Sequence, residues 1–268
     1  MNNLPLAISL LVLSVTTTIA DAKPAGELAN HAIAEYQEAL NTADRQKQIL
    51  GFRRAEHLFD QVITNFDINN AALYVNMGNA ALQGEHIGQA ILAYRRALTI
   101  TPGQATAQKN LEHTRQYLPN WVPRPQPNTL LDTFFFWRTT LSNGEIALIT
   151  GLCFAVASVL IAISVRWKHL WARNSAIIPI LVWLTLLVVS AMSHWSQASN
   201  NAVITTSQTI ARAADSAGAP IRFAEPLPAG TEVKVLEQRT DWARIQLANG
   251  HDAWVRLSSL TFVNPNQT

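Results

Sequence analysis

The chain has 268 residues, of which 14% are charged and 49% hydrophobic, and its formal net charge is +2. An ordinary soluble domain carries roughly 25% charged residues, so this composition excludes a disordered chain and indicates that part of the sequence meets lipid. A net charge this small gives no support for nucleic-acid binding, which needs a basic stripe or patch.

The sequence also lacks the usual signs of an enzyme. Its single cysteine, Cys153, excludes an intramolecular disulfide and a cysteine-based zinc site. No HExxH, GxGxxG, GxxxxGKS/T or GxSxG motif occurs. We therefore expect no enzyme activity, no metal and no cofactor.

The N-terminus reads as an export signal. Residues 4–20 carry no charge and lead into Ala20-Asp21-Ala22, which predicts a signal peptide over residues 1–22 that is cleaved before Lys23. No Lys or Arg precedes Lys23, so an uncleaved N-terminal anchor helix stays open as the alternative. Both interpretations export the segment that follows.

Residues 23–116 have the apolar periodicity of helices. Ala55, Phe59 and Val62 recur 35 residues later as Ala90, Tyr94 and Ala97, and each triplet occupies one helix face. A period near 34 residues with two helices per unit is typical of tetratricopeptide (TPR) repeats. A polar stretch at Asp44–Gln48 predicts a lengthened connection in the first unit, and residues 105–116 predict a capping third helix.

The second unit, residues 71–104, resembles the TPR family most closely. The matching residues are Tyr74, Met77, Gly78, Ala90, Tyr94, Ala97 and Pro102. Ala81 departs from the family, in which a Tyr is usual at that position. Gly78 allows two helices to cross closely, and Pro102 ends the unit.

The middle of the chain predicts a membrane hairpin. Residues 117–143 form a Pro-rich linker followed by an aromatic interfacial segment, and residues 144–165 and 174–195 are two apolar transmembrane helices. The loop between them, 166–173, contains three basic residues and no acid, which predicts a cytoplasmic location. Both flanking regions then lie outside, in the periplasm of a two-membrane bacterium.

Residues 201–263 alternate in the manner of short strands, and Asn249-Gly250 between two alternating runs predicts a hairpin. This stretch resembles a bacterial SH3-like (SH3b) domain, a small β-barrel. The matching segments are 230–236, 241–245, 249–250 and 254–255. The family's RSGPS signature is eroded to Arg212-Ala213-Ala214-Asp215-Ser216. The expected fold class is therefore multidomain α plus β, with TPR hairpins, a transmembrane hairpin and an SH3-like barrel.

The order of these segments resembles the BatE-type proteins of the Bat (aerotolerance) operons. The resemblance implies a multi-pass inner-membrane protein that works with von Willebrand A-domain membrane proteins and a MoxR-type AAA+ ATPase system. It implies a role in envelope stress or in the assembly of periplasmic complexes.

The residues that we expect to bind a partner line the TPR groove: Asn76, Asn79, Lys109 and Asn110. Amides and an ammonium can bind a peptide backbone or a terminal carboxylate, and the pattern resembles part of a TPR carboxylate clamp, although Val75 stands where that clamp has a Lys. The alternative is that the Asn residues satisfy local backbone. Trp242 and Trp254 are likewise either core residues or a ligand platform.

Three functions follow as hypotheses. The first is a non-enzymatic scaffold that presents TPR and SH3b modules to the periplasm and assembles a Bat-type complex. The second is a cell-wall module that binds peptidoglycan and recruits an envelope enzyme through the groove. The third, a membrane enzyme or transporter, has little support because neither predicted span has Asp, Glu, Lys or Arg in its interior, Glu145 being the second residue of the first span.

Overall fold

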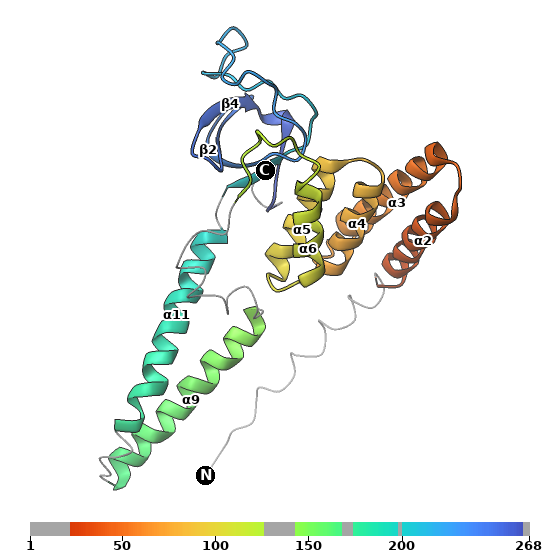
Figure 1. Cartoon of the computed structure of the whole chain (residues 1–268). Helices are drawn as coiled ribbons and strands as arrows, with labels where there is room; N and C mark the ends of the chain where they lie inside the picture. The colour runs from red at the N-terminus through yellow and green to blue at the C-terminus, as the bar shows by residue number, and fades with distance from the viewer. Residues whose placement is uncertain (1–21, 126–142, 168–173, 198–199, 265–268) are drawn as a thin grey trace, which may run out of the picture.

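The computed structural model describes residues 22–125, 143–167, 174–197 and 200–264. Within these ranges the protein is mixed α and β, with seven α-helices and one five-stranded antiparallel sheet (Figure 1). The predicted export signal lies outside the described residues except for Ala22, and so do most of the linker and of the basic loop.

The N-terminal part is a stack of five helices in which each packs against the next along the chain (Figure 1). Their bounds are α2 (Ala22–Asn41), α3 (Arg45–Asn65), α4 (Ala71–Gln83), α5 (Ile87–Ile100) and α6 (Ala105–Arg115). The polar stretch after Asp44 does not lengthen the connection, so that expectation is wrong. The Asp44 side chain accepts hydrogen bonds from the N–H groups of Gln46 and Lys47 and starts α3 directly.

Small residues and rings build the core of the stack, as their spacing predicts. Ala55, Phe59 and Val62 on α3 and their three counterparts on α5 are all at most 1% exposed. Gly78 on α4 lies against the Tyr94 ring so closely that a Cβ there would stand 2.6 Å from a ring carbon. The ring therefore occupies the space that the glycine leaves free, and α4 and α5 approach closely.

Two apolar helices follow, α9 (Asn143–Trp167) and α11 (Ile177–Gln197), and they pack against each other. The rings of Phe154 and Trp183 lie 5.5 Å apart across this contact. Among the described residues, one helical stretch, Ala147–Val165, is long and apolar enough to cross a membrane, with a mean hydropathy of 2.5 and only 6% of it buried.

The C-terminal part is an antiparallel sheet with strand order β4-β3-β2-β1-β5. Its strands are β1 (Asn201–Ile204), β2 (Glu232–Arg239), β3 (Trp242–Leu247), β4 (Asp252–Arg256) and β5 (Leu260–Phe262). The predicted turn between β3 and β4 is present, and Gly250 adopts φ +85° there, a conformation that glycine accommodates without strain. The core face of the sheet carries Val235, Ile245 and Val255, which are at most 2% exposed.

Candidate functional site

The structure brings two of the four predicted groove residues into contact. The side-chain oxygen Oδ1 of Asn79 on α4 accepts hydrogen bonds from the Tyr94 hydroxyl (2.8 Å) and from the side-chain amide of Asn110 on α6 (2.7 Å). Burial raises the pKa of Tyr94, so its hydroxyl stays protonated and donates. This network joins α4, α5 and α6 through side chains and fixes the orientation of Asn79.

Asn76 and Lys109 are placed differently. Asn76 is half-buried on α4 and Lys109 is exposed on α6. Among the described residues, neither side chain has a hydrogen-bonding or ionic partner. Both are therefore available to a ligand, whereas Asn79 and Asn110 already bind each other.

The sequence did not predict how closely the sheet packs against the helical stack. Val203 and Val263 from the sheet share one hydrophobic cluster with Ile91, Leu118 and Val122 from the helical part. Gly230, in the loop before β2, has φ +100°, and a Cβ there would stand 2.9 Å from Ile91. The two parts are thus joined by a continuous apolar core.

A buried ionic cluster lies in the same junction. Arg115, the last residue of α6, donates from Nε to Oε2 of Glu232 (2.7 Å) and from Nη2 to Oε1 (3.0 Å). Arg95 lies 3.3 Å from the same carboxylate, whose side chain is only 7% exposed. Burial alone would lower the pKa of Arg115, but its hydrogen bonds and charge interactions with Glu232 and, to a smaller extent, Glu112 outweigh that effect and raise the pKa.

Arg96 contacts the other edge of the junction. Its guanidinium donates to the carbonyl oxygens of Phe262 (3.1 Å) and Val263 (3.2 Å), at the end of β5. Burial lowers the pKa of this group, although a guanidinium remains charged at neutral pH. Adjacent arginines on α5 therefore bind a strand carboxylate and two strand carbonyls.

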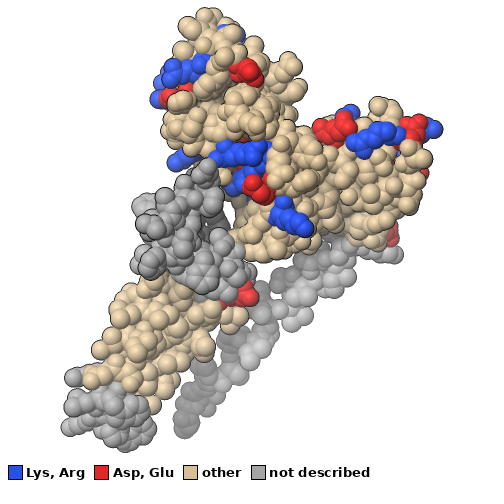
Figure 2. Space-filling model, in the orientation of Figure 1, with Lys and Arg blue, Asp and Glu red and all other residues tan. Residues whose placement is uncertain are grey.

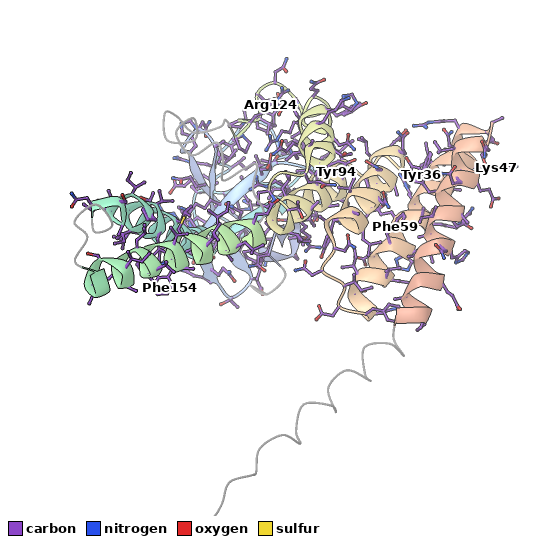
Figure 3. All side chains as sticks on the ribbon, turned by 90° about the horizontal axis from the view of Figure 1, so that it is seen from below. Tyr36, Lys47, Phe59, Tyr94, Arg124 and Phe154 are labelled. Carbon is purple, nitrogen blue, oxygen red and sulfur yellow. The ribbon has the colours of Figure 1, made fainter. Side chains whose placement is uncertain are left out.

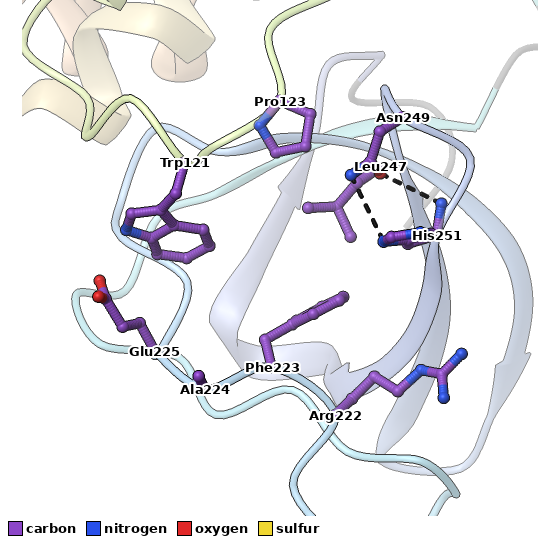
Figure 4. Close-up of a pocket in the computed structure, with 9 residues that line it drawn as sticks. All are labelled: Trp121, Pro123, Arg222, Phe223, Ala224, Glu225, Leu247, Asn249 and His251. Carbon is purple, nitrogen blue, oxygen red and sulfur yellow. Dashed lines mark hydrogen bonds between the residues drawn. The ribbon is translucent and has the colours of Figure 1, made fainter.

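A cavity of about 490 Å³ opens between the segment after α6 and the loops of the sheet (Figure 4). Trp121, Phe223 and Leu247 contribute its apolar surface, and Asn249 and His251 lie together at one side. Pockets of this volume and largely apolar lining hold small ligands or a few residues of a peptide. Trp121 and Pro123 follow the helical stack, and the other lining residues belong to the sheet and its loops. The cavity therefore exists only while the stack and the sheet are packed together.

Of the two tryptophans of the sheet, Trp254 is buried and Trp242 is half-buried, and neither is an open platform. Trp242 and Trp254 lie on the face opposite the core, because they alternate with buried residues such as Ala243 and Val255. Arg256 covers Trp242 at 4.5 Å from the ring centre. Trp254 is 8% exposed beneath Arg239, at 5.1 Å. Arginine stacking therefore covers the flat aromatic surfaces that a ligand would need.

The same face holds a further ion pair. Arg244 on β3 binds Asp252 on β4, and this hydrogen bond lowers the pKa of the carboxyl group. The three arginines of the face are each paired with a nearby acid. These three arginines are thus neutralised by neighbouring acids and are not free for an acidic or glycan partner.

Known proteins offer no direct guide to this site. No protein-family model, no curated protein and no solved structure matches the chain. In the part of the chain that the structure describes, no group of three His, Cys, Asp or Glu side chains is placed to hold a metal ion.

Proposed function

We propose that the protein is a non-enzymatic membrane scaffold that holds a partner in a TPR-like groove beside an SH3-like barrel. The proposed domains are TPR-like over residues 23–116 and SH3b over residues 201–263. The order of segments, the small residues between the helices and the curved five-stranded sheet support these assignments.

The observation that carries this proposal is the buried junction between the stack and the sheet. A flexible tether would let the two parts bind independently, whereas a shared core with a buried Arg115–Glu232 pair fixes their relative orientation. Fixed orientation lowers the entropic cost of binding a partner that contacts both parts. Rigid presentation of two binding modules is what an assembly scaffold requires.

In the proposed topology, α9 and α11 cross the inner membrane and both the stack and the sheet lie in the periplasm. The uncharged stretch of α9 and the basic residues after it support this arrangement. Alkaline phosphatase fused after residues 120 and 240 should be active, and a fusion at residue 170 should be inactive. An active fusion at residue 170 would contradict the topology.

The expected partners are von Willebrand A-domain membrane proteins and a MoxR-type AAA+ system, as the Bat-type order of segments suggests. A photoreactive amino acid at position 76 should crosslink these proteins in intact cells, because Asn76 lacks an internal partner in the groove. The same amino acid at the exposed position 47, at the start of α3, is the matched control. Equal crosslinking from both positions would refute a groove-specific partner.

The cavity beside Trp121 supports a second candidate function, attachment to peptidoglycan. Detergent-solubilised full chain would then sediment with purified sacculi, and Trp121→Ala would abolish this while leaving crosslinking from position 76 intact. Absence of the unmodified chain from the sacculus pellet would remove this candidate.

A further inference from the structure

A group of basic side chains surrounds the point where the chain passes from α11 into the sheet. The helix α11 ends at Gln197 and β1 begins at Asn201. Four residues span at most about 14 Å, so Asn201 stays close to the end of the apolar helix. Any side chain next to Asn201 is consequently near the C-terminal end of α11.

Three cations from two elements, α5 and β2, lie around Asn201. Lys234 on β2 is its direct antiparallel partner. On the other side, the N–H of Val263 donates to the carbonyl oxygen of Asn201 (2.9 Å), and the carbonyl oxygen of Val263 accepts from Arg96. Arg95 lines a cavity of about 290 Å³ together with Asn201, Lys234 and Glu232, whereas Arg96 lies outside its lining. We name Arg95, Arg96 and Lys234 the membrane-proximal basic cluster.

This cluster has a surplus of positive charge. The buried carboxylate of Glu232 accepts hydrogen bonds from Nε and Nη2 of Arg115, and Arg95 is its second cationic partner. Arg96 binds only carbonyl oxygens, and no carboxylate of the described residues lies within 4.0 Å of the exposed Lys234 ammonium. Figure 2 shows basic side chains, with an acidic one beside them, gathered where the sheet meets the helical stack.

We propose that the membrane-proximal basic cluster binds the headgroup of an anionic phospholipid. This inference rests on the proposed membrane insertion of α9 and α11, which places the cluster at headgroup depth. Anionic headgroups attract Lys and Arg within about a Debye length, about 8 Å at physiological salt. The 290 Å³ cavity accepts the phosphate beside Arg95 and Lys234 while the acyl chains lie along the apolar helices.

The three cations belong to α5 and β2, which come from different parts of the protein. A lipid bound there would therefore hold the stack and the sheet at a fixed height above the membrane. Arg239, Arg244 and Arg256, elsewhere on the sheet, differ from this cluster because each is paired with an acid.

The test uses full chain purified in neutral detergent and freed of lipid. Native mass spectrometry follows the titration of phosphatidylglycerol and of phosphatidylcholine with identical acyl chains. We expect tighter binding of phosphatidylglycerol, and about fivefold weaker binding of it by Lys234→Gln. Lys47→Gln, which removes an equally exposed cation at the far end of α3 (Figure 3), should leave the affinity unchanged.

Equal affinity for the two lipids, or an equal loss in both variants, would overturn the proposal. Flotation with vesicles of pure phosphatidylcholine separates this failure from failure of the proposed function. Chain that floats with these vesicles but does not prefer phosphatidylglycerol refutes the lipid site alone. Chain that fails to float with any vesicle refutes membrane insertion and the lipid site with it.

Discussion

Two glycines show how differently the two helical regions are built. In the stack, Gly78 lies against the Tyr94 ring, and a Cβ would stand 2.6 Å from it. In the apolar hairpin, which is the pair of helices α9 and α11, Gly151 on α9 has no neighbouring atom within 4 Å of the position that a Cβ would take. The same residue type serves close packing in one region and faces open surroundings in the other.

The difference reflects where each region keeps its apolar side chains. The stack turns them inward, and Phe52 and Phe59 are each 1% exposed. The hairpin turns them outward, and Leu148 and Val165 are each 75% exposed. Burial in water stabilises the first region, whereas the second exposes a surface that only a lipid or another apolar surface can cover.

The largest expected effect of a substitution lies at the junction between the stack and the sheet. Glu232→Ala removes the buried carboxylate shared by Arg115 and Arg95 and leaves Arg115 with only the exposed Glu112, which should lower the free energy of unfolding by about 3 kcal/mol. Urea unfolding of the full chain in detergent micelles, followed by tryptophan fluorescence, measures this. A loss below about 0.5 kcal/mol, the size of an ordinary surface substitution, would show that the pair does not hold the two parts together.

Within the stack, Gly78→Ala should be the next most harmful change. The added methyl group meets the buried Tyr94 ring, so we expect a loss of about 1–3 kcal/mol in the same unfolding experiment. Gly26→Ala on α2 is the matched control, because no atom lies within 4 Å of its Cβ position, and it should stabilise the chain slightly. If both variants unfold alike, α4 and α5 do not pack as described.

Removing one hydroxyl from the hydrogen-bond network of Asn79, Tyr94 and Asn110 should lower the free energy of unfolding less. Tyr94→Phe keeps the ring against Gly78 but deletes the hydrogen bond to Asn79, for an expected loss of about 1 kcal/mol. Asn79 still accepts from Asn110, so the stack should keep its fold. Far-ultraviolet circular dichroism of the folded variant should match that of the unmodified chain, and a changed spectrum would mean that the network does more than join three helices.

The smallest effect is expected in the hairpin. Gly151→Leu adds an apolar side chain to a surface without close neighbours, so the unfolding free energy of the stack and sheet should change by less than about 0.5 kcal/mol. A large destabilisation, measured by the same urea titration, would mean that this face of α9 packs against the rest of the protein.

Local patterns in the sequence predicted the elements well because each pattern is self-contained. The spacing of Ala90, Tyr94 and Ala97 is enough to predict a buried helix face, and Asn249-Gly250 is enough to predict a hairpin turn. The same reasoning misjudged the start of α3, because the polar residues after Asp44 resemble a loop until the capping hydrogen bonds are seen.

The junction could not be predicted in this way. Arg115 and Glu232 are 117 residues apart, and no local pattern relates a helix-terminal arginine to an acid at the start of a strand. Glu232 and Val233 keep the polar–apolar alternation of the strand in the sequence, so the burial of Glu232 beside the buried Val233 is visible only in the structure. The arginine-covered tryptophans were missed for a similar reason, since alternation places them on a face but does not reveal what covers it.

The position of β1 has a mechanical consequence. This strand receives the chain from α11 and lies between β2 and β5, with hydrogen bonds on both sides. A pull transmitted along α11 would load these two rows of bonds together, in shear, so that no row can open before the other. Because the sheet also shares an apolar core with the helical stack, a load carried along α11 would reach the stack through β1.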